Sequence, residues 1–256
     1  MILNVNNLAF HYKSHEILKD VNFSIKRGEI TVILGPNGVG KTTLLKCLNS
    51  ILFPQHGDIL VKNKNIREMD IKEIAKEISY VAQKNESTRI TAFDAILMGR
   101  HPHVRYKTSH DDLKKVDAVI KRLNLSKLCL KHLDQMSGGE LQKVSIARAL
   151  VQQTDLLLMD EPTSSLDLKN QTDVLSLIRH IVKGHNIAAV MTMHDLNTAL
   201  RYADQYIFLK DKTIYGVGKT NEISSKMVEE VYGVPVEIVY HKGSQVVVPI
   251  ENEKAA

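Results

Sequence analysis

The sequence predicts an α/β fold with an inserted helical lobe, and three observations support this prediction. An apolar run at 30–34 leads into a glycine-rich loop at 35–43 and then into helix-forming residues. The runs 155–160 and 186–192 are almost continuously apolar, as expected of strands buried in a parallel sheet. Residues 91–151 show helical periodicity and little strand signal. We therefore expect a sheet core that is interrupted by a block of helices.

The composition is that of one globular chain with a large core. The 256 residues are 43% hydrophobic and 25% charged, and the longest apolar runs are too short to cross a bilayer. The chain begins in a strand-like segment without a signal pattern. Its net charge of +5 is spread rather than clustered, so it identifies neither a nucleic acid nor an anionic membrane as partner. We expect a cytosolic protein, or one that a partner holds at a membrane.

The N-terminal part is expected to be rich in strands. Segments 2–10 and 21–25 alternate apolar and polar residues, as half-buried strands do. A turn cluster at 53–58 follows the helix after the glycine loop. We expect further strands at 59–61 and 78–81, and between them a short helix over 71–76 that is capped by Asp70.

The helical lobe is expected to begin after Gln83. Thr91 can cap a first helix, and either Ser109 or Asp111 can cap a second at 113–123, whose apolar stripe recurs at helical spacing. A third helix is expected at 141–150.

The core is expected to resume at 155. The remaining expected elements are helices at 168–183, 195–202 and 225–232 and strands at 207–209, 213–217, 236–240 and 245–250. The domain division expected from this order places a core at 1–85 and 155–218, a helical subdomain at 86–154 and a C-terminal extension at 219–256.

The glycine loop has the spacing G-x-x-x-x-G-K-T in the context of strand, loop and helix. Glycines let the backbone N–H groups face an anion closely, and the helix N-terminus adds positive potential. Lys41 can place its charge at the β- and γ-phosphates of a nucleotide, and the hydroxyl of Thr42 suits Mg²⁺. The loop predicts a nucleoside triphosphate site and leaves open what the nucleotide is used for.

Two acids follow the apolar strand at 155–160. Ligands of open parallel sheets bind beyond the carboxyl ends of the strands, so Asp160 and Glu161 should meet the phosphates. Asp160 is a candidate Mg²⁺ ligand, and Glu161 can orient and deprotonate an attacking water. Pro162 is expected to keep Glu161 extended, because the residue before a proline avoids the helical conformation.

Two further features allow two readings each. Ser137 and the glycines that follow it can form a second anion site at a helix N-terminus or can simply cap that helix. A second phosphate loop exceeds what one nucleotide needs in one chain, which suggests a site shared between two copies. Tyr12 can stack on an adenine ring or be a half-buried surface aromatic.

These motifs together resemble those of the ATP-binding subunits of ABC transporters. The resemblance covers Walker A at 35–43, Walker B at 156–161, the signature at 136–140, the glutamine loop at Gln83, the D-loop at 165–167 and the switch histidine His194. Two departures are mild: Met136 stands where the signature usually has Leu, and Ala82 where a proline is usual.

The resemblance implies a P-loop NTPase core with an antiparallel β subdomain and an inserted α-helical subdomain. It implies two copies that sandwich ATP and Mg²⁺. The nucleotide contacts would be Tyr12, Gly35, Asn37, Gly38, Gly40, Lys41, Thr42 and Thr43, with Ser137 and Gly139 from the second copy. The catalytic residues would be Lys41, Gln83, Glu161 and His194, and the Mg²⁺ ligands Thr42, Gln83 and Asp160. Asp167 would link the two sites.

The segment 91–100, followed by Pro102, is similar to one in ATPases of iron-siderophore, haem and cobalamin uptake. Residues 201–218 fit the same group, although Lys212 replaces a more usual glycine. This resemblance implies permease subunits and an extracytoplasmic substrate-binding protein as partners, at the cytoplasmic face of the membrane, and no nucleic acid. The alternatives are another transport substrate, a soluble ATPase that acts on nucleic acid, and a regulatory nucleotide-binding module. His101, His103 and His110 are expected to be surface histidines.

Overall fold

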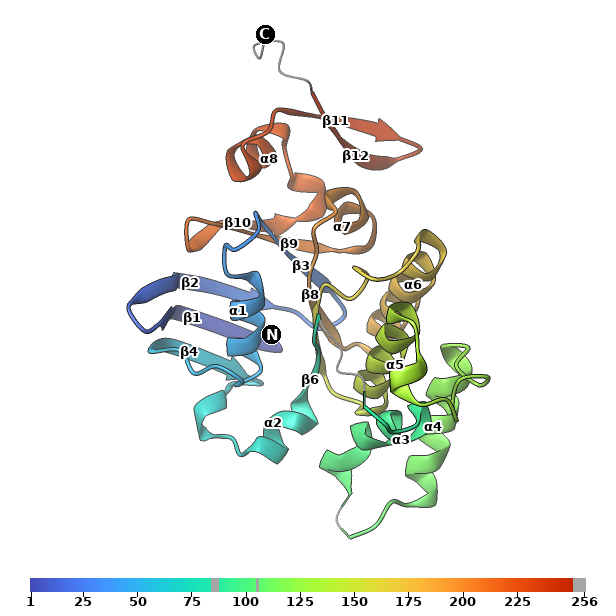
Figure 1. Ribbon diagram of the computed structural model, residues 1–256. Helices are drawn as coiled ribbons and strands as arrows, with labels where there is room; N and C mark the ends of the chain where they lie inside the picture. The colour runs from blue at the N-terminus through green and yellow to red at the C-terminus, as the bar shows by residue number, and fades with distance from the viewer. Residues whose placement is uncertain (84–87, 105, 251–256) are drawn as a thin grey trace.

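The computed structural model describes residues 1–83, 88–104 and 106–250. Its centre is a six-stranded sheet in the order β10-β9-β3-β8-β7-β6 (Figure 1). The strands are β3 (Ile30–Leu34), β6 (Ile78–Val81), β7 (Leu156–Asp160), β8 (Ala188–Thr192), β9 (Gln205–Lys210) and β10 (Thr213–Lys219). All neighbours pair in parallel except β9 and β10. Every residue of β3, β7 and β8 is buried, which explains their continuous apolar runs.

A second, antiparallel sheet has the order β2-β1-β4-β5. Its strands are β1 (Leu3–Tyr12), β2 (His15–Ile25), β4 (His56–Val61) and β5 (Lys64–Asn65). Helix α1 (Lys41–Leu48) lies between the two sheets, and its buried leucines share one apolar core with both (Figure 1). The glycine loop is thereby held between two rigid layers.

The structure adds to the expectations for this sheet in three places. β2 begins at His15 because Lys13 adopts a positive φ of 52° and closes a tight hairpin. β4 begins at His56, inside the expected turn, since Gly57 passes so close to Asn6 that a Cβ would lie 2.5 Å from its carbonyl oxygen. The short strand β5 was not expected at all.

The helical lobe contains α3 (Ala92–Leu97), α4 (His110–Arg122) and α5 (Gly138–Val151), with 3₁₀ turns at Met98–His103 and Leu133–Gln135. Ser109, rather than Asp111, caps α4 in a capping box with Asp112. A buried ion pair fastens the lobe internally: Arg100 Nε donates to Asp112 Oδ1 at 2.8 Å, and Arg100 Nη1 donates to the carbonyl of Val151 at 2.8 Å.

Three further helices lie beside the central sheet. They are α2 (Ile71–Glu77), α6 (Leu168–His185) and α7 (Leu196–Tyr202), with a 3₁₀ turn at Ile66–Glu68. Asp70, Asp167 and Asp195 cap these helices with their carboxylates. Helices α5, α6 and α7 share a second apolar core with the face of the sheet that α1 does not cover.

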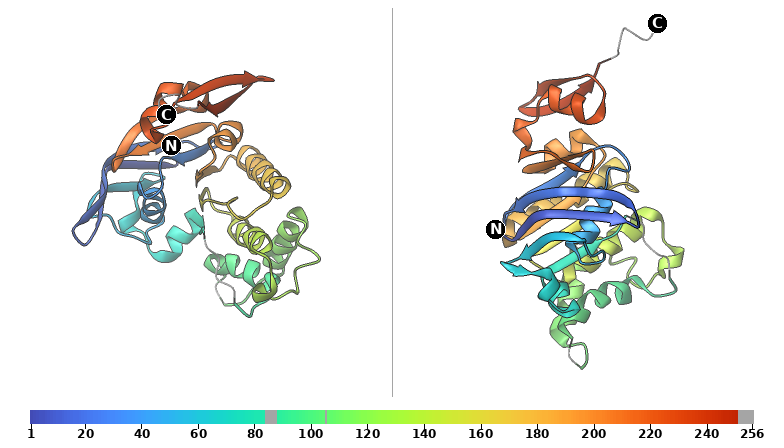
Figure 2. Two further views of the ribbon diagram at one scale, coloured as in Figure 1. Left: turned by 45° about the horizontal axis from the view of Figure 1, so that its top comes forward. Right: turned by 90° about the vertical axis from the view of Figure 1, so that its left-hand side faces the viewer.

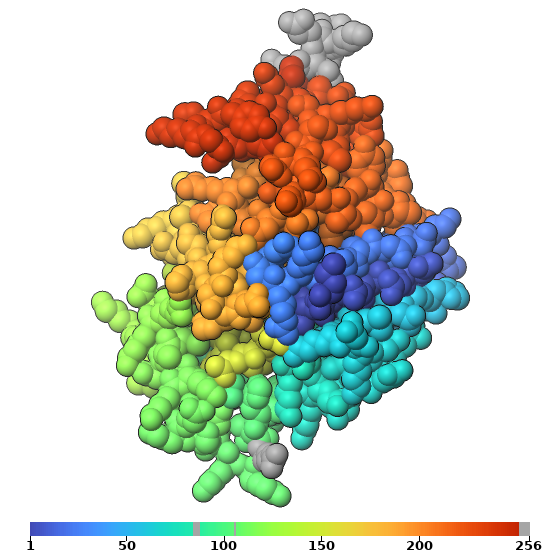
Figure 3. All heavy atoms as spheres, turned by 180° about the vertical axis from the view of Figure 1, so that it is seen from behind, coloured from blue at the N-terminus to red at the C-terminus, as the bar shows by residue number. Residues whose placement is uncertain are grey.

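The C-terminal segment stacks on one end of the molecule, and the helical lobe occupies the opposite end (Figures 2 and 3). It contains a 3₁₀ turn at Thr220–Glu222, α8 (Ser225–Tyr232) and a hairpin of β11 (Val236–His241) and β12 (Ser244–Pro249). The side chain of Asn197 on α7 makes two hydrogen bonds to the backbone of Val247, which dock the hairpin on the core. Within the described residues no helix is long and apolar enough to cross a membrane.

Candidate functional site

The loop after β3 wraps around the amine of Lys41. Gly35 has a φ of +143°, and a Cβ there would lie 2.3 Å from the carbonyl oxygen of Leu209, so no other residue fits. Lys41 is only 6% exposed, and its Nζ donates to the carbonyls of Gly35 at 2.7 Å and Pro36 at 2.9 Å. Asn37 and Gly38 are exposed at the crest of the loop. The loop thus encloses the amine of Lys41. Its exposed crest leaves backbone N–H groups accessible to an anion.

Asp160 on β7 links the start of α1 to the neighbouring strand β8 through two hydrogen bonds. Its Oδ1 accepts hydrogen bonds from the hydroxyls of Thr42 at 3.1 Å and Thr192 at 2.7 Å. The parallel register of β7 and β8 places Asp160 beside Thr192, and Asp160 is 1% exposed. Sequence reasoning missed Thr192. The available signal was a polar residue that ends a buried apolar strand next to the strand of the acids.

Glu161 is the meeting point of side chains that follow three parallel strands. Gln83, after β6, donates from Nε2 to Glu161 Oε2 at 2.6 Å. His194, after β8, contacts Glu161 Oε1 with its Nε2. The carboxyl ends of parallel strands lie at one edge of the sheet, which is why these residues converge.

The expectation that Pro162 keeps Glu161 extended was wrong. Glu161 has a φ of +47°, in the left-handed region. A following proline disfavours the right-handed helical conformation, and it leaves this alternative open. The backbone N–H of Glu161 donates to the hydroxyl of Thr192 at 2.9 Å, which holds the turn and directs the carboxylate toward Gln83 and His194.

Burial and neighbouring charges both act on the ionisable groups at this edge. Burial lowers the pKa of Lys41, and the neighbouring carboxylates of Glu161 and Asp160 oppose that shift. Burial, together with the negative charge of Asp160, raises the pKa of Tyr80. One buried ammonium and two carboxylates beside an anion-binding loop suit a phosphate group and a divalent cation. The oxygens of Thr42, Asp160 and Gln83 are the donor type that Mg²⁺ prefers.

The predicted signature residues lie at the N-terminus of α5. Ser137 caps that helix in a capping box with Glu140, so the cap reading is confirmed. Gly139 packs against the turn before α6, where a Cβ would lie 3.3 Å from Leu166 Cδ2. Among the described contacts of this chain, none joins Ser137 or Gly139 to Lys41. Their part in phosphate binding stays a prediction.

Two other predicted residues also stand apart from the loop. Tyr12 ends β1 with 45% of its surface exposed, and its ring packs edge-on against Phe10 at 4.8 Å. Asp167 caps α6 by accepting the N–H of Asn170 at 2.8 Å. No described hydrogen bond connects either side chain with the glycine loop.

A contact from the C-terminal segment reaches the loop, and sequence reasoning missed it. The N–H of Gly35 donates to the hydroxyl of Tyr232 on α8 at 3.0 Å. The ring of Tyr232 packs against Phe208, and its burial raises the pKa of its hydroxyl to about 12. No local pattern points to this contact, because 197 positions separate the two residues.

The fold and the site together define a protein of the class that binds and hydrolyses nucleoside triphosphates at a glycine loop. A family model described as ABC transporter matches residues 18–164 of the chain. The chain belongs to the ABC transporter family, as one of its ATP-binding, ATP-hydrolysing members. The predicted family and fold class are confirmed.

Two known proteins are similar in sequence to this chain over nearly its whole length. An uncharacterized ABC transporter ATP-binding protein of Methanocaldococcus jannaschii is 50% identical, over 98% of each chain. A protein of Helicobacter pylori named for iron chelatin transport is 37% identical, over 96% of this chain and 99% of its own.

Two solved structures extend the comparison. One, described as a metal-chelate type ABC transporter in an inward-facing conformation, is 31% identical over 99% of this chain and 98% of that chain, with a TM-score of 0.83. The other, a dimeric ATP-binding cassette in a post-hydrolysis state with ADP and Pi, is 28% identical over 86% of this chain and 100% of that chain, with a TM-score of 0.79.

Proposed function

We propose that this ATPase energises the import of a metal chelate, such as an iron-siderophore, haem or cobalamin-like compound. The observation that carries the ATPase part is the convergence of Gln83 and His194 on Glu161 beside the buried Lys41. The cargo class is supported by the similar chain named for iron chelatin transport and by the similar structure described as metal-chelate type.

In this proposal ATP lies along the loop 35–43. The N–H groups around Gly38 and Gly40 face the phosphates, and Thr43 lies in the first turn of the helix behind them. Lys41 turns from the two loop carbonyls that it now contacts to the β- and γ-phosphates, which are stronger partners for an ammonium. Tyr12 stacks on the adenine, which its exposed ring allows.

Mg²⁺ is held by Thr42, Asp160 and Gln83. When bound, the ion neutralises phosphate charge that develops during hydrolysis. The 3.1 Å contact between the Thr42 hydroxyl and Asp160 Oδ1 supports this assignment, because both atoms are hard oxygen donors at the carboxyl edge of the sheet. Thr192 fixes the orientation of the Asp160 carboxylate.

Glu161 accepts the proton of the attacking water. Its position one residue beyond Asp160 supports this role, and the amide of Gln83 and the imidazole of His194 orient its two oxygens. His194 then lies where it can donate to the γ-phosphate. Catalysis consists of positioning and charge stabilisation by groups that the fold already holds in place.

The site is completed by a second copy of the chain. Ser137 and Gly139 of that copy cover the γ-phosphate with the N-terminus of α5, and Asp167 connects the two sites. The exposed position of Ser137 supports this, as does the dimeric state of a similar cassette. Permease subunits, together with an extracytoplasmic substrate-binding protein, make up the importer, and this chain sits at the cytoplasmic face of the membrane.

The test is reconstitution with the permease subunits that co-purify with this chain. We expect ATP hydrolysis in proteoliposomes to rise when a binding protein loaded with a ferric siderophore, haem or a cobalamin is added. The same preparation with Glu161→Gln should show neither hydrolysis nor uptake. Stimulation of hydrolysis by DNA, without any response to a loaded binding protein, would contradict the proposal and favour the nucleic-acid alternative.

A further inference from the structure

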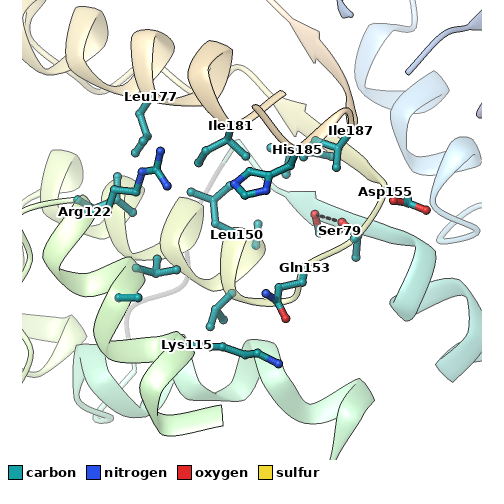
Figure 4. A pocket seen from close by; sticks show the side chains of 17 residues that line it. Ser79, Lys115, Arg122, Leu150, Gln153, Asp155, Leu177, Ile181, His185 and Ile187 are labelled. Carbon is teal, nitrogen blue, oxygen red and sulfur yellow. Dashed lines mark hydrogen bonds between the residues drawn. The ribbon is translucent and has the colours of Figure 1, made fainter. Parts of the chain in front are cut away.

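A cavity of about 400 Å³ lies between the helical lobe and the core, away from the nucleotide loop (Figure 4). Its walls are α4 and the end of α5 on one side and α6 on the other. Its base is formed where parallel strands begin, at Ser79, Leu157 and Ile187. Glu161 and His194 follow the opposite ends of the same sheet. The cavity is therefore a separate site.

The lining is mainly apolar. Val119, Leu150, Leu177, Ile181 and Ile187 remain only half-buried around it, since no side chain of the described residues fills the space. The polar groups at the base are already satisfied, because Thr154 Oγ1 donates to Ser79 Oγ at 2.9 Å. An occupant that covered these apolar side chains would remove their surface from water, which favours binding. A volume of this size is typical of small-molecule sites.

The mouth of the cavity carries positive charge. Arg122 and His185 extend toward each other above Leu150 (Figure 4), and neither has a hydrogen bond or ion pair among the described residues. Lys115 also lines the cavity and pairs with Asp111 at 2.7 Å. An anion at the mouth would meet the guanidinium of Arg122 without displacing another acid.

Among the described residues, the one acid that borders the cavity is engaged elsewhere. Asp155 accepts a hydrogen bond from Arg27 at 2.7 Å and also contacts Lys62. These two cations, with the hydrogen bond from Arg27 as the largest cause, hold the pKa of Asp155 below its ordinary value. Its charge is thus compensated, and Arg122 is the cation of the lining that has no ion pair among the described residues.

The geometry points to a binding site for a small amphipathic anion. Its acid group pairs with Arg122 and His185, and its aliphatic part lies against Leu150, Leu177 and Ile181. Arg122 belongs to the helical lobe and Leu177 to the core, so the ligand ties the two together. It also touches α5, the helix that presents Ser137 at its other end.

Isothermal titration of the full chain with decanoate, kept below its micelle concentration, tests this site. We expect a single class of sites for decanoate. Decyltrimethylammonium, which has the same chain length and the opposite charge, should bind roughly tenfold more weakly or worse, and acetate should not bind. Equal binding of the two decyl compounds would overturn the proposal, because it would show adsorption to apolar surface without charge selection.

Two variants locate the site. Arg122→Glu should weaken decanoate binding by roughly tenfold or more, while Lys114→Glu, an equal charge change on an exposed position of α4 outside the cavity, should leave it unchanged. Ala118→Trp fills the cavity from its exposed rim and should abolish binding with an unaltered circular dichroism spectrum. Equal weakening by both charge reversals would show attraction by net charge and overturn the assignment.

Two controls distinguish this cavity from the nucleotide site and from a membrane-binding surface. Lys41→Ala should retain decanoate binding, so that a failure of the ATPase proposal and a failure of this one are distinguishable. Sedimentation with phosphatidylglycerol vesicles distinguishes a free amphiphile from a lipid of the bilayer. Pelleting of the native chain but not of Ala118→Trp would assign the occupant to the membrane and contradict a free ligand.

Discussion

The hydroxyl of Tyr232 accepts a hydrogen bond of 3.0 Å from the backbone N–H of Gly35, the first residue of the nucleotide loop. The contact joins the C-terminal segment to the site across the edge of the central sheet. Because Phe208 on β9 packs against the tyrosine ring, the hydroxyl is held in position from behind. The segment after β10 thus supports the loop as well as covering the core.

Tyr232→Phe removes the acceptor and leaves the N–H of Gly35 without this partner. We expect the free energy of unfolding to fall by about 1–3 kcal/mol, the cost of an unsatisfied buried donor, and ATP to bind more weakly. Urea unfolding and nucleotide titration measure the two effects. Tyr215→Phe is the matched control, because that hydroxyl contacts Glu230 within the C-terminal segment. Equal losses in both variants would show a general effect of the segment.

Glu161→Gln should leave ATP binding intact and lower hydrolysis by roughly a hundredfold or more, as expected on loss of a general base. The amide keeps the size of the side chain but cannot take a proton from water. Single-turnover hydrolysis and gel filtration with ATP measure the outcome, and the variant should accumulate as an ATP-bound dimer. Turnover at the native rate would exclude Glu161 as the base.

Thr192→Val should lower hydrolysis by roughly tenfold, because Asp160 loses one donor and the N–H of Glu161 loses its acceptor. Valine preserves the shape and the strand preference of the position. Thr192→Ser retains the hydroxyl and should restore most of the rate. If serine and valine behave alike, the effect arises from packing in β8 and not from the hydrogen bonds.

Arg100→Leu should lower the free energy of unfolding by about 3–5 kcal/mol, since it leaves the Asp112 carboxylate buried without its cation. The two residues are 3% and 7% exposed. Asp111→Asn, which breaks an exposed pair on the same helix, is the control and should change the stability little. Denaturant titration compares the two variants.

The pair of Arg100 and Asp112 also makes the free energy of unfolding depend on pH in a defined direction. Hydrogen bonds from Ser109 and then Arg100 hold the pKa of Asp112 below its ordinary value in the folded chain. The unfolded chain therefore binds this proton more readily, so the stabilisation is complete above the ordinary pKa and is lost as the pH falls through the folded pKa. We expect the free energy of unfolding, measured from about pH 7 to about pH 3, to decline less steeply in Asp112→Asn than in the native chain. Equal slopes of the two stability curves against pH would contradict a stabilising role of the Asp112 carboxylate.

Much of the site was predictable from the sequence because its signals are local. The loop at 35–43 depends on glycine spacing between one strand and one helix, and Ser109 and Ser137 cap helices through residues three positions away. Asp160 and Glu161 were predictable because a buried strand must end at the carboxyl edge. The division of the chain at 85, 154 and 218 stays a prediction.

Other features depended on how distant segments pack. The left-handed turn at Glu161 exists because β7 pairs with β8 in a register that brings Thr192 beside it. The support of Gly35 by Tyr232 and the cavity between α4 and α6 need elements that are far apart in sequence to meet. The sequence by itself determined the glycine loop, the acids and the helix caps at Asp70 and Thr91, since neighbouring residues specify them. Only the tertiary structure decided which side chains from other strands and helices hold them in place, because sheet order and register are properties of the whole chain.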